Sequence, residues 1–555
     1  MPTPFNVRSL LSHIGALLLT TLVVQGCGSM PAKHVEHEQQ ALYQAKTQAR
    51  LMQAKRMKAP PRPSASMHAI ASPLKRTDNS QEQYESTPTN PIKQVVNDPV
   101  STFSVDVDSA SYTNIRRMLR RGQQVPAQAV RVEEIVNYFS YNDPVPQSPE
   151  IPLAIQAQSM PTPWNPHTRL MRIGIQGYEL PIADRPTANL VFLLDISGSM
   201  GAQNKLELVK KSFRYLVQHL RTEDRVSIVT YSDETSIALP PTAGHKRTEI
   251  MQVVNQLQAD GSTNGSAGLR MAYDLAREHF KADQLNRILL ATDGDFNFGQ
   301  TNHETLEQQV ARERKSGIYL SVLGYGEGNL NDALMQKLAQ AGNGIAYYVD
   351  SLLEANKIFS QQLFSTLFPI ANDVKIQVEF NPAHVAEYRL IGYETRMLKR
   401  EDFTNDQVDA GEIGSGHSVT ALYEYAPIGQ SFQHVYPLRY ATQKTAKTRK
   451  AQATPQEVRH ETAFIRVRYK RPGHTESQEL TRAVTMQDHH TTVEGAPEDL
   501  RFAAAVAGFA QRLKDSPHLK NYDYAPITKL LRHARGADPF GYRSELLQLI
   551  PLANK

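Results

Sequence analysis

Between residues 188 and 365 the chain alternates between short apolar runs and longer segments with helical periodicity. The apolar runs predict strands; they are NLVFLLDIS, RVSIVTYS, RILLATDG, IYLSVLGYG and IAYYVDS. Apolar residues recur every three or four positions in the segments between them, which predicts helices over 205–220, 247–259, 266–280, 303–317 and 331–342. Apolar strands that alternate with helices are typical of a mainly parallel sheet with both faces covered. We therefore expect a doubly wound α/β domain over 188–365.

The pattern changes on both sides of this domain. Strict alternation of apolar and polar residues predicts half-buried strands over 151–160, 169–180, 373–382, 388–394, 417–427 and 462–472. We expect these strands to form a β-sandwich-like region that flanks the α/β domain or has that domain inserted into it. Accordingly, 101–187 is interpreted as a flanking region of strands plus a helix, 366–496 as an antiparallel β region and 497–555 as a helical segment.

The N-terminus has the pattern of a secretory signal. Arg8 precedes a short apolar run from Ile14 to Val24, which is too short to span a bilayer, and a small residue leads into Cys27. This arrangement resembles the lipobox of bacterial lipoproteins, which implies a signal peptide over 1–26 and lipidation of Cys27. Gly28 in the next position implies the outer membrane. The polar, proline-containing stretch 27–100 is interpreted as a flexible tether, so the lipid would be the protein's contact with the membrane of the bacterial cell envelope.

The amino-acid composition argues against several classes of partner and site. The formal net charge of +5 is small for 555 residues, so nothing points to nucleic acid as a partner. The single cysteine excludes an internal disulfide framework and a CxxC metal site.

Small oxygen-bearing side chains follow three of the predicted apolar strands or their turns. Asp195, Ser197 and Ser199 form the motif DISGS, Thr263 lies in the glycine-rich turn GSTNGS, and Asp293 ends a strand in TDG. The carboxyl ends of parallel strands meet at one edge of a doubly wound sheet, where ligands bind. Hard divalent cations prefer oxygen ligands of these kinds. The alternative is that Asp195 caps a helix and the serines satisfy a turn.

The three-part pattern resembles the metal-ion-dependent adhesion site of von Willebrand factor type A domains. The resemblance covers about 188–365 and implies hydroxyl ligands from Ser197, Ser199 and Thr263. It further implies that Asp195 and Asp293 act mostly through bound water, and that a carboxylate from a partner protein fills the one open position. The resemblance implies Mg²⁺, with Ca²⁺ and Mn²⁺ as alternatives. The stretches FSVDVDSASY and GYRSELLQL resemble the flanks of the YfbK-type group of bacterial lipoproteins.

Two other motifs give weaker indications of a ligand-binding site. Asp293, Asp295, Asn297 and Glu304 match the EF-hand ligand positions, but Phe298 stands where the loop needs glycine, and a strand rather than a helix precedes it. GYGEGN lacks the last glycine of a dinucleotide-binding loop, and no Walker lysine occurs.

The sequence therefore predicts a lipid-anchored, non-enzymatic envelope protein that binds an Asp or Glu of a partner protein through a metal ion. One alternative is a metal-dependent hydrolase, which would need a further base and a substrate cleft. Another is an envelope scaffold in which the metal site is vestigial.

Overall fold

The computed structural model describes residues 84, 87–294, 303–327, 331–363, 368–408, 410–429, 435 and 459–554. The predicted signal peptide, Cys27, the proposed tether up to residue 83, and Asp295 and Asn297 of the EF-hand-like motif lie outside these residues. None of the described helices is long and apolar enough to cross a lipid bilayer.

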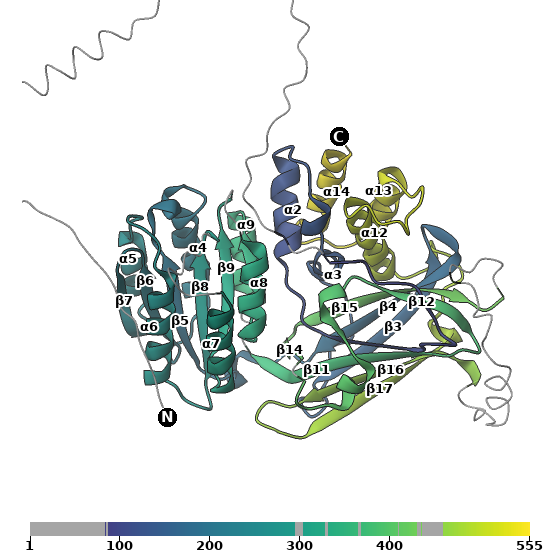
Figure 1. Cartoon of the computed structure of the whole chain (residues 1–555), viewed down its shortest axis with the longest axis horizontal. Helices are drawn as coiled ribbons and strands as arrows, with labels where there is room; N and C mark the ends of the chain where they lie inside the picture. The colour runs from purple at the N-terminus through teal and green to yellow at the C-terminus, as the bar shows by residue number, and fades with distance from the viewer. Residues whose placement is uncertain are drawn as a thin grey trace, which may run out of the picture. The chain divides into compact units, whose positions relative to one another are not determined.

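The central part of the chain forms one six-stranded sheet (Figure 1). The strands are β5 (Ala188–Asp195), β6 (Arg225–Tyr231), β7 (Thr235–Ala243), β8 (Leu285–Thr292), β9 (Tyr319–Tyr325) and β10 (Ala346–Val349). Their order is β10-β9-β8-β5-β6-β7, and all neighbours are parallel except β6 and β7. The predicted doubly wound, mainly parallel α/β fold is confirmed. The antiparallel edge strand β7 was not foreseen, because its sequence TSIALPPTA contains two prolines and its burial is irregular.

Alternate residues of β5 explain why helices cover both faces of this sheet. Leu190, Phe192 and Leu194 pack against one set of helices, α4 (Leu206–His219), α5 (Arg247–Gln256) and α9 (Leu352–Lys357). Val191 and Leu193 face the other set, α6 (Gly265–Glu278), α7 (His303–Lys315) and α8 (Asp332–Ala341). Since side chains alternate along a strand, a strand that is apolar at every position needs a hydrophobic layer on each side.

Segments from both sides of the α/β domain build the β-sandwich. One antiparallel sheet has the order β1-β12-β15-β4-β3, the other β13-β2-β11-β16-β17, and β14 pairs with β11. The strands before the α/β domain are β1 (Lys93–Gln94), β2 (Val100–Ser104), β3 (Leu153–Thr162) and β4 (Asn165–Gly177). Those after it are β11 (Pro369–Phe380), β12 (Val385–Ile391), β13 (Met397–Leu398), β14 (Gly411–Gly414), β15 (Ser418–Pro427), β16 (Glu461–Lys470) and β17 (Ser477–Thr485). Residues of both sheets share one core, so the α/β domain is inserted between β4 and β11.

The sandwich begins before residue 101, where the tether was expected to end. Lys93 and Gln94 already pair with β12, and the buried side chain of Asn90 donates a hydrogen bond of 2.7 Å to the Gly392 carbonyl oxygen. A two-residue edge strand has no periodicity, so the sequence pattern gives no sign of it.

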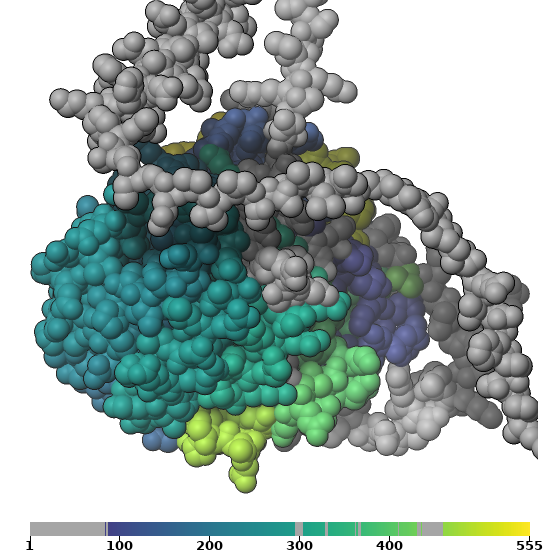
Figure 2. Space-filling view, turned by 60° about the vertical axis from the view of Figure 1, so that its left-hand side comes forward, coloured from purple at the N-terminus to yellow at the C-terminus, as the bar shows by residue number. Residues whose placement is uncertain are grey.

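The C-terminal helical segment is confirmed as α12 (Glu498–Leu513), α13 (Tyr524–His533) and α14 (Tyr542–Ala553). These helices share a core with α2 (Ala110–Arg120) and α3 (Val132–Asn137), which come from the other end of the described chain. In Figure 2, teal atoms of the α/β domain form a continuous surface that green atoms of the β region adjoin, consistent with the hydrogen bond between Asn343 and Glu412.

Arg116 on α2 links the helical segment to the α/β domain. Its fully buried guanidinium pairs with Glu354 at 2.8 Å, with Glu545 of α14 at 3.1 Å and with Asp350. One buried cation therefore holds carboxylates from two regions that are nearly two hundred residues apart in sequence.

We expect Arg116→Met to destabilise the protein by about 3–5 kcal/mol, because it leaves the Asp350 and Glu354 carboxylates without this cation and Glu545 with Arg120 alone. The free energy of unfolding, from urea titration followed by circular dichroism, is the measurement. Arg120→Met on the same helix is the matched control: Arg120 is half-exposed and pairs with Glu545 alone among the described carboxylates, so about 1 kcal/mol or less is expected. Equal losses in the two variants would contradict the role assigned to Arg116.

Candidate metal site

The structure brings the predicted site residues to the carboxyl edge of the parallel sheet. Asp195 ends β5, and Asp293 directly follows β8, the strand beside it. The chain leaves β5 for β6 on one side and later returns to β8 on the other, so the two aspartates lie at the point where strand order reverses.

The DISGS turn and the glycine-rich turn contact each other through the backbone. The Gly198 N–H donates to the Gly261 carbonyl oxygen at 2.9 Å, and the Asp260 N–H donates to the Ile196 carbonyl oxygen at 2.8 Å. A Cβ atom on Gly198 would lie 3.2 Å from that same Gly261 oxygen, so glycine permits this close approach. These bonds hold the turn that carries Thr263 against the DISGS turn.

Hydrogen bonds occupy both oxygens of the buried Asp195 carboxylate. Oδ1 accepts from the Ser197 N–H at 2.9 Å and from the Ser197 hydroxyl at 2.6 Å. Oδ2 accepts from the Tyr231 hydroxyl at 3.1 Å and from the Thr292 hydroxyl at 3.3 Å. Among the described residues no Lys, Arg or His forms an ion pair with this carboxylate, so its charge is stabilised by neutral donors.

The electrostatics follow from this burial. Burial and the nearby charge of Asp293 raise the pKa of Asp195 to about 6, against the opposing effect of the hydrogen bonds from Ser197 and Tyr231. Burial raises the pKa of Tyr231 well above its ordinary value, which keeps its hydroxyl protonated as a donor to Asp195. Burial makes the charged form of Asp195 unfavourable, and a bound cation would stabilise that form.

The hydroxyl groups are arranged so that their oxygens can accept a cation. Ser197 donates its proton to Asp195, which leaves the lone pairs of its oxygen free to point elsewhere. The Ser197 and Ser199 oxygens are 3.0 Å apart. Ser197 is buried and Ser199 is exposed, so the cluster opens to solvent at Ser199. No three His, Cys, Asp or Glu side chains of the described chain form a metal-binding group, so a cation here would depend on hydroxyl oxygens as well as on the two aspartates.

Three neighbours of the site were missed by the sequence reasoning: Lys205, Tyr231 and Thr292. The ammonium of Lys205 lies 2.7 Å from Asp293 Oδ2. Tyr231 and Thr292 end β6 and β8, so the rule that pointed to Asp195 could have found them. Lys205 stands just before α4, and only the fold shows that its side chain reaches Asp293.

The EF-hand-like and nucleotide-like motifs gain no support. The described part of the EF-hand-like motif runs from the end of β8 to α7, and its middle lies outside the described residues. In GYGEGN, Gly324 and Tyr325 end β9, and Gly326 has a φ of +81°, which makes the turn.

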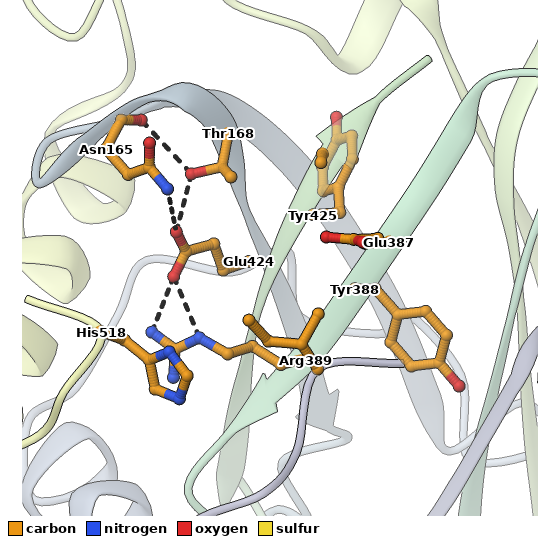
Figure 3. A pocket seen from close by; sticks show the side chains of 10 residues that line it. Asn165, Thr168, Glu387, Tyr388, Arg389, Glu424, Tyr425 and His518 are labelled. Atoms are coloured by element: carbon orange, nitrogen blue, oxygen red, sulfur yellow. Dashed lines mark hydrogen bonds and ion pairs between the residues drawn. The ribbon is translucent and has the colours of Figure 1, made fainter. Parts of the chain in front are cut away.

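A second polar cluster lies in the sandwich, in a hollow of about 300 Å³ (Figure 3). The carboxylate of Glu424 accepts hydrogen bonds from Thr168 at 2.7 Å, from Trp164 at 3.0 Å and from the Arg389 guanidinium at 2.7 Å. Although burial favours the neutral form, Arg389 and these hydrogen bonds hold the pKa of Glu424 below its ordinary value. This carboxylate is already paired with a cation, so we assign the cluster to stability.

Comparisons with known protein families match three parts of the chain. The family model "von Willebrand factor type A domain" matches residues 189–361, "Uncharacterized protein YfbK, C-terminal" matches 365–555 and "von Willebrand factor" matches 78–172. The uncharacterized protein YfbK of Escherichia coli (strain K12) is 42% identical over 479 residues, which cover 85% of this chain and 81% of that protein.

More distant relatives match a smaller part of this chain. Inter-alpha-trypsin inhibitor heavy chain H3 of Mesocricetus auratus is 24% identical over 210 residues, which are 36% of this chain and 23% of that protein. The solved structure of von Willebrand factor type A from Catenulispora acidiphila is 11% identical, with a TM-score of 0.41, and covers 74% of this chain and 91% of its own.

We expect Tyr231→Phe to lower the free energy of unfolding at pH 7.5 by about 1.5–3 kcal/mol, because it removes a hydrogen bond to a buried charge. Tyr273→Phe is the matched control. Tyr273 is equally buried, but its hydroxyl has no hydrogen-bond partner among the described residues, so its removal is expected to be neutral or slightly stabilising. Urea denaturation of both variants measures the difference, and a loss in Tyr273→Phe as large as in Tyr231→Phe would argue against the hydrogen bond to Asp195.

Proposed function

The chain belongs to the YfbK family and carries a von Willebrand factor type A domain, and from this premise we propose that it binds a partner protein through a divalent metal ion. Asp195, Ser197, Ser199, Thr263 and Asp293 would hold the ion, and a carboxylate of the partner would complete its coordination.

The observation that carries this proposal is the buried Asp195 carboxylate, which has four hydrogen bonds and no paired cation among the described residues. A divalent ion bound to the adjacent hydroxyls would neutralise this charge. The ion would keep residual positive charge, because in the described chain Asp195 and Asp293 are the carboxylates of the site and Lys205 already partners Asp293. An acidic side chain on the partner would be attracted to that charge.

Mg²⁺ is the ion we propose, because it suits a site with few protein ligands and keeps several of its waters. Ca²⁺ and Mn²⁺ are the alternatives. Mn²⁺ is a probe of similar size and ligand preference.

We place the protein in the bacterial cell envelope, anchored through a lipid on Cys27 and most consistent with the outer membrane. The basis is the N-terminal sequence pattern. We further propose that the protein is a binding protein and not an enzyme, in keeping with its von Willebrand factor type A domain.

The decisive experiment is capture of partners from a cell-envelope lysate by the full-length protein. We expect capture in Mg²⁺, loss of capture in EDTA, and loss in Asp195→Ala with circular dichroism unchanged. Asp283→Ala is the matched control, since Asp283 is an exposed carboxylate that precedes β8 at the opposite edge of the sheet, and capture should persist.

Capture that is indifferent to EDTA and to Asp195→Ala would overturn the proposal and favour a scaffold with a vestigial site. Turnover of phosphoester or peptide substrates that Asp195→Ala abolishes would instead favour the hydrolase.

For the anchor, we expect Cys27→Ser to abolish incorporation of radiolabelled palmitate and to release the protein from the membrane fraction. Cys27 is the single cysteine of the chain, so labelling of the wild type reports on that position alone. Unchanged membrane association of an unlabelled variant would contradict lipid anchoring.

A further inference from the structure

We propose that Lys205 is a fixed counter-cation of the metal site, which lowers the affinity for the divalent ion and keeps the loaded site positively charged for an anionic ligand. This inference rests on the proposed function and identifies a residue that sets the specificity of that site.

The Lys205 ammonium is directed at Asp293. Its Nζ atom donates to Asp293 Oδ2 at 2.7 Å, and both side chains are buried, that of Asp293 completely. Lys205 therefore carries a unit of positive charge next to one of the two carboxylates that would face the metal ion. Because the pair is shielded from water, its electrostatic effect is larger than that of a surface ion pair.

A glycine in a neighbouring loop holds the lysine in this position. Gly326 has a φ of +81°, and a Cβ atom there would lie 2.4 Å from Lys205 Cε and 2.5 Å from Lys205 Cγ. The backbone of the loop thus packs directly on the aliphatic part of Lys205. The Gly326 carbonyl oxygen in turn accepts a hydrogen bond from the buried Tyr348 hydroxyl.

Residues on both sides of this contact fix the loop and the turn before α4. The side-chain amide of Asn204 donates to Glu327 at 3.2 Å, and Glu327 pairs with Arg121 and, at 3.8 Å, with Arg117 of α2. Withdrawing the lysine from Asp293 would require a rearrangement of this packed loop. We infer that the ammonium remains beside Asp293 whether or not a metal ion is bound.

The charges of the two aspartates and the lysine determine how strongly the site attracts a metal ion and an anionic ligand. Among the described residues of the site, Asp195 and Asp293 together contribute two negative charges and Lys205 one positive charge, so these three side chains have one net negative charge without a metal ion. A divalent ion then brings the site to one net positive charge, whereas without Lys205 it would be neutral. The lysine therefore weakens the attraction of the metal ion and strengthens that of a carboxylate ligand.

The test uses Mn²⁺ alone and the full chain. We expect Lys205→Met to bind Mn²⁺ about tenfold more tightly than the wild type, because a unit charge this close to a divalent ion changes its affinity by roughly that factor even with strong screening. The free Mn²⁺ signal in electron paramagnetic resonance gives the dissociation constant.

Three further variants serve as controls. Lys211→Met removes the same charge from an exposed position on the same helix and should leave the Mn²⁺ affinity within about twofold. Lys205→Arg retains the charge and should bind Mn²⁺ more weakly than Lys205→Met. Gly326→Ala should displace the lysine and tighten Mn²⁺ binding without altering Lys205 itself.

Sodium acetate is the carboxylate probe. Its displacement of Mn²⁺-bound water, followed by water proton relaxation, should need about tenfold more acetate in Lys205→Met than in the wild type. Opposite changes for the ion and for acetate support the proposal; equal or weaker Mn²⁺ binding in Lys205→Met, or an unchanged acetate titration, overturns it.

The Mn²⁺ measurements distinguish a failure of this inference from a failure of the proposed function. If the wild type binds Mn²⁺ and Asp293→Ala abolishes binding while Lys205→Met has no effect, the metal site stands and the role of Lys205 is wrong. If the wild type binds no Mn²⁺, both are wrong. If Lys205→Met is unstable without metal, Lys205→Gln replaces it, and the rise in melting temperature caused by Mn²⁺ must exceed that of the wild type.

Discussion

Burial of the Asp195 carboxylate is the constraint on which the site depends. The carboxylate ends the central strand of a sheet that is apolar on both faces, where an isolated charge is strongly unfavourable. The chain compensates with donors from three strand ends: Ser197 after β5, Tyr231 at the end of β6 and Thr292 at the end of β8. These donors fix the carboxylate but leave its negative charge unbalanced, and the two serine hydroxyls next to it supply oxygens for a cation.

Three other buried acids in the protein differ from Asp195 in having a cation partner. Glu424 pairs with Arg389, Glu354 pairs with Arg116, and Asp332 pairs with Arg131 at 2.8 Å. Each of these carboxylates has a guanidinium partner, and each ties segments that are distant in sequence. The pKa of Glu424 is held down by its arginine, while that of Asp195 is raised. This contrast in charge pairing distinguishes Asp195 from these three acids.

The inserted topology places the site in contact with the flanking helices. The chain builds half of the sandwich, then the α/β domain, then the other half, so both ends of the inserted domain are fixed by the same β core. The Lys205 side chain packs under the Gly326 turn, whose neighbour Glu327 pairs with the arginines of α2. The charge next to Asp293 is thus held by contacts that begin outside the α/β domain.

The sequence by itself determined the fold class and pointed to the residues of the candidate site. Continuous apolar strands require two covering layers, alternating strands require one, and DISGS, GSTNGS and TDG follow strands whose carboxyl ends meet at one edge; these are local patterns. Tertiary structure alone decided that Lys205 reaches Asp293 and that α2 packs on the C-terminal helices. A lysine before a helix has the same local pattern whether its ammonium points to solvent or to a carboxylate 88 residues further along the chain, because only the packing of the Gly326 loop directs it. Tertiary structure also decided the edge strands β1 and β7. They form because a neighbouring strand offers hydrogen bonds, and not because their own residues alternate.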